Sequence, residues 1–369
     1  MLCILKDTVV ACKSTTFINI CITANAILPP LLTTFTNHLS LSTLGHAMNW
    51  DRETLIQELG EFDWALPDAP AGPQLQAYSQ HYSLNFDDSS EALSHQAGIT
   101  KLGGFDIAVQ RWMTGSAVGT AILVHGYYDH VGLYKNLIDF CLRQNLNVVA
   151  FDLPGHGLSS GEQAVIANFQ DYDAVFSEVV EKVQANMPEP LFALGQSTGG
   201  AILINFLLKR GFTAEECPFA DVILLAPLVR PMGWRKGMIL QPVLSLFLKQ
   251  MKRKHGDSSS DADFLDFVRS QDPLQSLFLS VEWVGALIKW MRFIEAQPAT
   301  DVPMFIVQGD EDGTVDWRHN MKVLEEKFPQ RELFVLEEGR HHLVNESLAK
   351  RSDMYQHIAK RLQTRLALS

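Results

Sequence analysis

The sequence of 369 residues lacks any uninterrupted apolar run long enough to cross a bilayer, so we expect no transmembrane helix. Cysteine is scarce, and five residues in a chain of this length exclude a disulfide framework. Basic residues are fewer than acidic residues, with 30 Lys and Arg and 42 Asp and Glu. The resulting net charge of -12 repels phosphate backbones, so nucleic acid is not an expected partner.

Several motifs of cofactor and metal chemistry are also absent. The sequence holds no H-E-x-x-H, no C-x-x-C and no P-loop, and the glycines at 155–161 miss G-x-G-x-x-G by one place. We therefore predict no cofactor and no metal. What is present, 47% hydrophobic and 20% charged residues, is the composition of a globular protein.

The first 47 residues differ from the rest, because their only charged residues are Lys6, Asp7 and Lys13. We predict a poorly ordered extension. A start codon assigned upstream of Met48 is an open alternative, since the composition changes there. A secretory signal is a weaker one, because the pair Pro29 and Pro30 interrupts the apolar run and no clear cleavage pattern follows it. We expect a cytoplasmic protein.

Beyond a predicted group of strands at 92–126, short apolar segments alternate with segments of helical periodicity. We predict strands at 146–151, 191–194, 222–226, 304–307 and 333–336, and helices at 133–143, 169–183, 201–209, 321–328 and 348–366. Buried strands alternating with helices predict an α/β fold with a mostly parallel central sheet that is flanked by helices.

One block interrupts this alternation. Residues 230–297 contain no convincing strand, and their net charge is about +3 by simple counting, in a chain that is otherwise acidic. Long insertions between sheet strands are usually functional. We predict a helical cap, or lid, at 230–297, placed between a first core part at 48–229 and a second core part at 298–369.

The candidate nucleophile is Ser197. The apolar segment 191–194 runs into Gly195-Gln-Ser-Thr-Gly199, and a predicted helix follows. This is G-x-S-x-G between a strand and a helix, where a strained turn exposes the hydroxyl and side chains at the glycine positions would clash with neighbouring elements.

A serine nucleophile needs a base and an orienting acid, in the chain order Ser, acid, His. Asp310 and Asp312 follow the strand predicted at 304–307, and His341 and His342 follow the strand predicted at 333–336. The carboxyl ends of parallel strands meet at one edge of the sheet, so these residues are the candidates for acid and base.

The loop after the apolar segment 121–124, His125-Gly-Tyr-Tyr-Asp-His130, is the candidate oxyanion hole. A carbonyl oxygen that becomes negative needs two preorganised N–H donors. We assign this role to the backbone N–H groups of Tyr127 and Thr198, and we interpret His125 and His130 as residues that brace the loop.

Four blocks resemble the α/β-hydrolase superfamily, and within it the monoglyceride lipase and lysophospholipase-like group, which is often labelled serine aminopeptidase-like. They begin at His125, Phe151, Gly195 and Gly309, the last together with the segment from Gly339, and the resemblance spans 99–366 without most of the insertion. The resemblance implies Asp312 as the acid, three residues after its glycine, and His342 as the base, three residues after its own.

The resemblance implies a serine hydrolase that cleaves carboxylic esters through an acyl-enzyme, with a monoacylglycerol or a lysophospholipid as the small-molecule substrate. Apolar segments at 238–251 and 283–294 suit a long acyl chain, although packing of the cap on the body explains them equally well. The cations at 249 and 252–254 suit transient contact with a lipid surface, and a solvated basic face is the simpler interpretation.

Two alternatives stay open. An aminopeptidase or amidase on the same scaffold needs an acidic cluster for an α-amino group, and the candidates are Asp257, Asp261, Asp263 and Asp266 in a predicted flexible turn. A non-catalytic ligand-binding protein of this fold is the other alternative, because fold alone does not determine function. The sequence does not predict an oligomeric state.

Overall fold

A computed structural model describes residues 49–65, 71–86, 93–253 and 256–368. The extension predicted at 1–47 lies outside these residues. The described residues belong to one compact unit, Asn49–Ser369.

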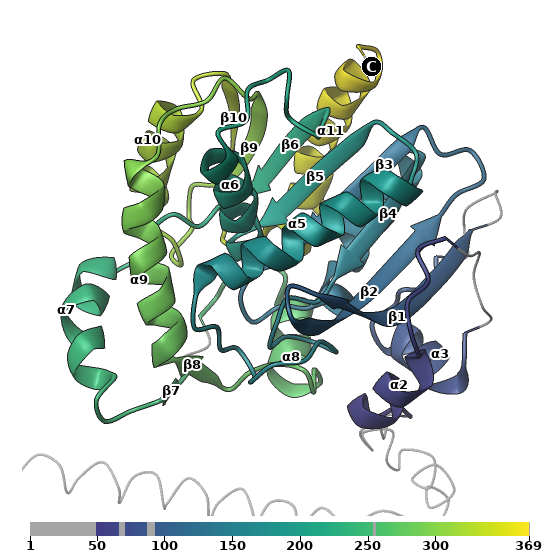
Figure 1. Ribbon diagram of the computed structural model, residues 1–369, viewed down its shortest axis with the longest axis horizontal. Coiled ribbons are helices and arrows are strands. Elements are labelled where there is room, and N and C mark those ends of the chain that lie inside the picture. The colour runs from purple at the N-terminus through teal and green to yellow at the C-terminus, as the bar shows by residue number, and fades with distance from the viewer. Residues whose placement is uncertain (1–48, 66–70, 87–92, 254–255, 369) are drawn as a thin grey trace, which may run out of the picture. The chain divides into compact units, whose positions relative to one another are not determined.

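The centre of this unit is an eight-stranded sheet in the order β1-β2-β4-β3-β5-β6-β9-β10 (Figure 1). The pairs β1–β2 and β2–β4 are antiparallel, and every other neighbouring pair is parallel. This confirms the predicted α/β fold class. The strands are β1 Ser94–Leu102, β2 Phe105–Met113, β3 Gly119–Val124, β4 Leu146–Phe151, β5 Leu191–Gln196, β6 Asp221–Leu225, β9 Met304–Gly309 and β10 Arg331–Leu336.

Helices cover both faces of the sheet. Outside the insertion they are α2 Arg52–Leu59, α3 Pro73–His81, α4 Lys135–Arg143, α5 Phe169–Asn186, α6 Thr198–Arg210, α10 Trp317–Lys327 and α11 Leu348–Leu366, with 3-10 turns at η2 Val131–Tyr134 and η3 Leu343–Asn345. Side chains of α5, α6 and α10 share one buried cluster with the sheet, and those of α4 and α11 share the other. Among the described helices, none is both long and apolar enough to cross a membrane.

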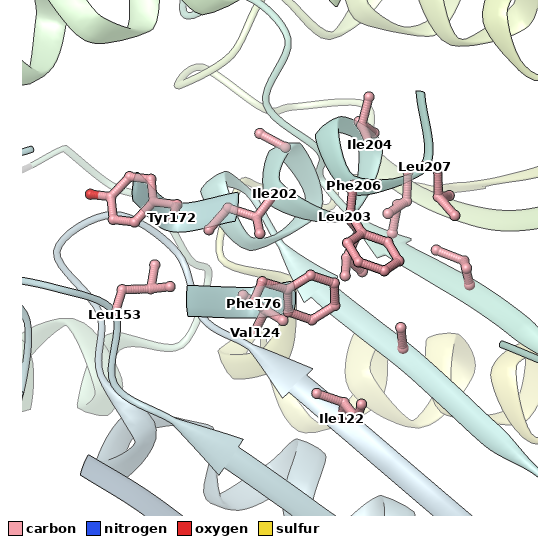
Figure 2. Close-up of a cluster of buried hydrophobic side chains, with 14 of the residues drawn as sticks. Ile122, Val124, Leu153, Tyr172, Phe176, Ile202, Leu203, Ile204, Phe206 and Leu207 are labelled. Carbon is pink, nitrogen blue, oxygen red and sulfur yellow. The ribbon is translucent and has the colours of Figure 1, made fainter. Parts of the chain in front are cut away.

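The cluster on the α5 and α6 face shows why the central strands are apolar throughout. Figure 2 shows Tyr172 and Phe176 of α5 near the side chains of α6, with Ile122 and Val124 of β3 beneath them. The strands β3, β4, β5 and β9 are buried at every position, because helices exclude water from both of their faces. Because these strands are buried on both faces, the polar groups of a site are expected in the loops at the strand ends.

The insertion, residues 230–297, lies between β6 and β9. It contains α7 Trp234–Leu244, β7 Gln250–Lys252, α8 Ala262–Ser270, β8 Phe278–Ser280 and α9 Val281–Ala296. The prediction that it holds no strand is wrong, because β7 and β8 form an antiparallel pair. Each has three residues, which is too short for a periodic pattern in the sequence.

The turn predicted around the insertion's aspartates is also shorter than expected. The carboxylate of Asp261 accepts a hydrogen bond from the backbone N–H of Phe264 at 3.0 Å and so caps α8. Asp263 and Asp266 consequently lie on a helix rather than in a turn.

Candidate active site

Ser197 sits on a sharp turn between β5 and α6. Its backbone φ is 53° and ψ is -110°, a conformation that L-residues rarely adopt and that costs about 1–3 kcal/mol. The flanking glycines are required by space: a Cβ at Gly199 would lie 2.0 Å from the carbonyl oxygen of Val124, and one at Gly195 would lie 2.6 Å from the carbonyl carbon of Gly199. The G-x-S-x-G pattern thus forms the strained turn that the sequence predicts.

A chain of two hydrogen bonds runs from Ser197 to Asp312 through His341. The Nε2 atom of His341 lies 2.9 Å from the Oγ atom of Ser197, and its Nδ1 atom lies 2.8 Å from the Oδ2 atom of Asp312. An ionised carboxylate only accepts hydrogen bonds, so Nδ1 of His341 carries the proton and Nε2 is free to accept the proton of the serine hydroxyl. This is the arrangement of a nucleophile, a base and an orienting acid.

The structure contradicts the prediction of His342 as the histidine of this group. The Nε2 atom of His342 lies 3.2 Å from the Oδ1 atom of Asp129, without the alignment of a hydrogen bond, and its ring contacts Phe264. Gly339 packs against Gly309, so the turn after β10 meets the turn after β9 at a fixed point. From that point the side chain of residue 341 faces Asp312, and the side chain of residue 342 points elsewhere.

Asp312, rather than Asp310, is the carboxylate that contacts His341. The Oδ1 atom of Asp312 accepts the backbone N–H groups of Thr314 at 2.8 Å and Val315 at 3.1 Å. Burial opposes ionisation, but His341 and these two amides outweigh it and hold the pKa of Asp312 below its usual value. The carboxylate is therefore charged and fixed in orientation.

The proposed oxyanion donors border the serine. A Cβ at Gly126 would lie 3.4 Å from the Cβ atom of Ser197, so loop 125–130 passes directly beside the nucleophile. Within the described residues, neither the backbone N–H of Tyr127 nor that of Thr198 donates a hydrogen bond to a protein group. Two N–H groups without a partner in the protein are available to a negative oxygen, which agrees with their predicted role.

His125 braces this loop in one defined tautomer. Its Nε2 atom accepts the backbone N–H of Leu153 at 2.9 Å, so the proton is on Nδ1, which donates to the carbonyl of Gly126 at 2.7 Å. Burial, and then the neighbouring His156, lower the pKa of His125 to about 3. The imidazole is neutral at physiological pH, which agrees with its interpretation as a bracing residue.

Two buried glutamines support the histidine and the acid, and sequence reasoning missed both. Gln196 donates from Nε2 to the backbone carbonyl of His341 at 2.8 Å, and Gln308 donates from Nε2 to Oδ2 of Asp312 at 3.1 Å. Each is the last or second-last residue of a strand. A polar residue at the end of an otherwise apolar strand is the signal that could have identified them.

The insertion contacts both loops of the site. The buried pair His130 and Asp272 joins loop 125–130 to the insertion, with 3.0 Å between Nε2 and Oδ2. Burial opposes the charge on His130, but Asp272 outweighs it and raises the pKa of His130. On the other side, the backbone N–H of His342 donates to the carbonyl of Ser258 at 2.7 Å. The insertion is therefore attached both to loop 125–130 and to the loop that carries His341.

The side chains in the described part of the chain hold no group of three or more His, Cys, Asp or Glu residues arranged around a common metal position. The polar groups at the site are instead paired with one another, as His341 is with Asp312.

Curated proteins with similar sequences include lipases. Monoglyceride lipase of Homo sapiens is 29% identical over 245 residues, which cover 64% of this chain and 78% of that protein. The phospholipase YtpA of Bacillus subtilis is 26% identical over 212 residues, covering 56% and 80% respectively.

Solved structures share the fold. A soluble variant of monoglyceride lipase from Saccharomyces cerevisiae, in complex with a substrate analog, superposes with a TM-score of 0.62 at 20% identity and covers 76% of this chain and 97% of its own. Monoacylglycerol lipase of Paleococcus ferrophilus gives a TM-score of 0.60 at 19% identity, with 70% and 99% covered.

The family model described as serine aminopeptidase, S33, matches residues 115–348, a span that begins before β3 and ends after His341. Because this match covers more than half of the sequence, the chain belongs to the serine aminopeptidase S33 family of α/β-hydrolases.

Proposed function

We propose that the protein is a serine hydrolase that cleaves carboxylic esters through an acyl-enzyme, with monoacylglycerols or lysophospholipids as substrates. The observation that carries the proposal is the position of His341, 2.9 Å from Ser197 and 2.8 Å from Asp312. The relatives named as monoglyceride lipases and a phospholipase support the substrate class.

The mechanism follows from these contacts. His341 accepts the proton of Ser197 as the Oγ atom attacks the acyl carbonyl, and Asp312 stabilises the imidazolium. The backbone N–H groups of Tyr127 and Thr198 hold the oxyanion. The protonated His341 then gives its proton to the leaving alcohol, and in the second half it activates the water that releases the acid.

The insertion lines a cavity with apolar side chains. The cavity has a volume of about 530 Å³, typical of small-molecule sites, and lies between α7, α9 and residues 162–167. Its lining includes the apolar side chains of Met238, Leu248, Val281 and Ile288 together with charged side chains, and it includes neither Ser197 nor His341. We propose that the insertion, with the boundaries 230–297, acts as the cap over the site.

The aminopeptidase alternative gains no support from the insertion's aspartates. Asp257 pairs with Arg269 at 2.9 Å, and Asp261 caps α8. Asp261 and Asp263 line a cavity of about 430 Å³ whose lining includes neither Ser197 nor His341.

Purified wild-type protein, assayed beside Ser197→Ala, tests the function. We expect hydrolysis of long-chain monoacylglycerols and of lysophosphatidylcholine, weaker hydrolysis of short-chain esters, and background rates from the variant. Release of aniline from an aminoacyl anilide, together with slow hydrolysis of the esters, would instead establish a peptidase. Equal rates for wild type and Ser197→Ala would overturn the proposal.

We also propose that the insertion docks transiently on a lipid surface. No side chain of α7 is buried, and Ile239, Val243, Leu246 and Phe247 are between 58% and 78% exposed at helical spacing. Arg235, Lys236, Lys249 and Lys252 are exposed, lie on both sides of these apolar residues in the sequence and suit anionic head groups. Arg253, which was expected in the same basic cluster, instead turns inward onto the ring of Tyr128.

Vesicle binding tests the docking proposal. Replacing Leu246 and Phe247 together with serine is expected to weaken partitioning onto phosphatidylcholine–phosphatidylserine vesicles at least tenfold, because each large apolar side chain contributes roughly 1.5–3 kcal/mol when buried. Leu348→Ser is the matched control, since Leu348 is 71% exposed outside the insertion. Equal partitioning of the double variant and the control would refute the proposed surface. Turnover of a short, water-soluble ester should be unchanged in both.

A further inference from the structure

The two tyrosines of loop 125–130 are embedded in the insertion. The ring of Tyr127 stacks on Trp283 of α9 with 3.8 Å between centroids and 19° between planes. The ring of Tyr128 lies under the guanidinium of Arg253, 3.8 Å from its centroid, and its backbone carbonyl accepts Nε2 of Gln275 at 3.0 Å. Successive residues of a loop in the body are thus held by separate elements of the insertion.

The peptide unit between Gly126 and Tyr127 carries one of the proposed oxyanion donors, and its two ends are held differently. Its carbonyl oxygen accepts Nδ1 of His125 at 2.7 Å and the backbone N–H of Asp129 at 3.1 Å, both from the loop itself. Because the peptide unit is planar, these two bonds also restrain its N–H, but they leave the unit free to rotate about the axis of the carbonyl bond. That rotation moves the N–H together with the Cα atom of Tyr127. An anchored Tyr127 side chain limits this remaining freedom of the donor.

Trp283 and its neighbour Ser280 provide most of that anchor. Trp283 lies in the first turn of α9 and is 6% exposed, and its backbone N–H donates to the Oγ atom of Ser280 at 3.1 Å. The backbone N–H of Ser280 in turn donates to the hydroxyl of Tyr127 at 3.4 Å, and that hydroxyl donates to the carbonyl of Ala164 at 2.7 Å. One end of α9 thus fixes both the ring face and the hydroxyl of Tyr127.

We propose that Trp283 is a positioning residue for catalysis, which holds the backbone N–H of Tyr127 where the oxyanion forms. The proposal rests on the proposed function, because an oxyanion donor matters only if the protein is a serine hydrolase. On this proposal, the insertion does more than line an acyl pocket, because its contact with Tyr127 also contributes to catalysis. A donor displaced from its position stabilises the transition state less while substrate binding changes little.

The test compares Trp283→Leu with Trp290→Leu on a short, soluble p-nitrophenyl ester. Trp290 lies on the same helix, is 2% exposed and stacks on Phe169 rather than on loop 125–130, so its loss disturbs α9 packing without touching the donor. Rates are normalised to active sites titrated with a fluorophosphonate, which removes any contribution from misfolded protein. We expect kcat of Trp283→Leu to fall roughly 10–100-fold with KM within about threefold, and kcat of Trp290→Leu to stay within about threefold.

Two further measurements separate positioning from a structural role. Inhibition by a short trifluoromethyl ketone, whose tetrahedral adduct carries an oxyanion, should weaken in Trp283→Leu by the same factor as kcat/KM. Trp283→Phe retains an aromatic face for Tyr127 and should restore kcat to within about threefold of wild type.

A double-mutant cycle measures whether Tyr127 and Trp283 act together, and it provides a second test if one variant folds poorly. Tyr127→Leu removes the other half of the stack, so Tyr127→Leu with Trp283→Leu should be no slower than the slower single variant. Multiplicative losses, or equal kcat for Trp283→Leu and Trp290→Leu, would overturn the role of Trp283. A wild-type protein that neither hydrolyses esters nor reacts with the fluorophosphonate would instead overturn the proposed function.

Discussion

His341→Ala is expected to lower kcat by roughly four to six orders of magnitude while the fold is retained. Without the imidazole, no group within hydrogen-bond distance of Ser197 Oγ can accept its proton, since the Nε2 atom of His341 is the one base recorded there among the described residues. Members of such a group act as a unit, so His341→Ala combined with Ser197→Ala should be no slower than either single variant. Steady-state kinetics on a soluble ester, with circular dichroism as the folding check, provides the measurement.

His342→Ala is the matched control, because the two histidines are adjacent and similarly buried, at 8% and 7% exposed. His342 faces Asp129 and Phe264, so its loss should leave kcat within about tenfold of wild type and act mainly by lowering the melting temperature. Asp129 keeps its hydrogen bond from the hydroxyl of Tyr134 at 3.0 Å, which limits the damage. Inactive His342→Ala beside active His341→Ala would restore His342 as the base.

Asp312→Asn is expected to reduce kcat by about 10⁴-fold and to lower stability by about 1–3 kcal/mol, because its amide nitrogen replaces the Oδ2 atom that accepts Nε2 of Gln308. The amide oxygen can still accept the backbone N–H groups of Thr314 and Val315, so the loop is preserved. The amide nitrogen, however, donates toward Nδ1 of His341 and favours the tautomer that carries its proton on Nε2. That tautomer cannot accept the proton of Ser197. Kinetics together with a thermal melt separates this effect from unfolding.

The control for this change is Asp310→Asn, two residues earlier in the same loop. Neither a hydrogen bond nor an ion pair between Asp310 and His341 is recorded in the described part of the chain, so we expect activity within about threefold of wild type. The reverse ranking of the two variants would move the acid to Asp310.

The strand pattern was predictable because a strand that is buried on both faces appears in the sequence as a short apolar run. The strand predicted at 146–151 and the helix predicted at 348–366 coincide with β4 and α11. In each case the spacing of apolar residues depends only on the repeat of the element itself. The strands β7 and β8 were not predicted, because three residues are too few to show such a repeat.

The sequence by itself determined the fold class, the strained turn at Ser197 and the strand ends at which acid and base must lie. The glycines, the apolar strands and the chain order are local or one-dimensional properties. Only the tertiary structure decided between His341 and His342, because adjacent side chains point in different directions and only the packing of the two loops shows that His341 faces Asp312. It also decided that α9 meets Tyr127, since packing between segments more than 150 residues apart leaves no signal in either of them.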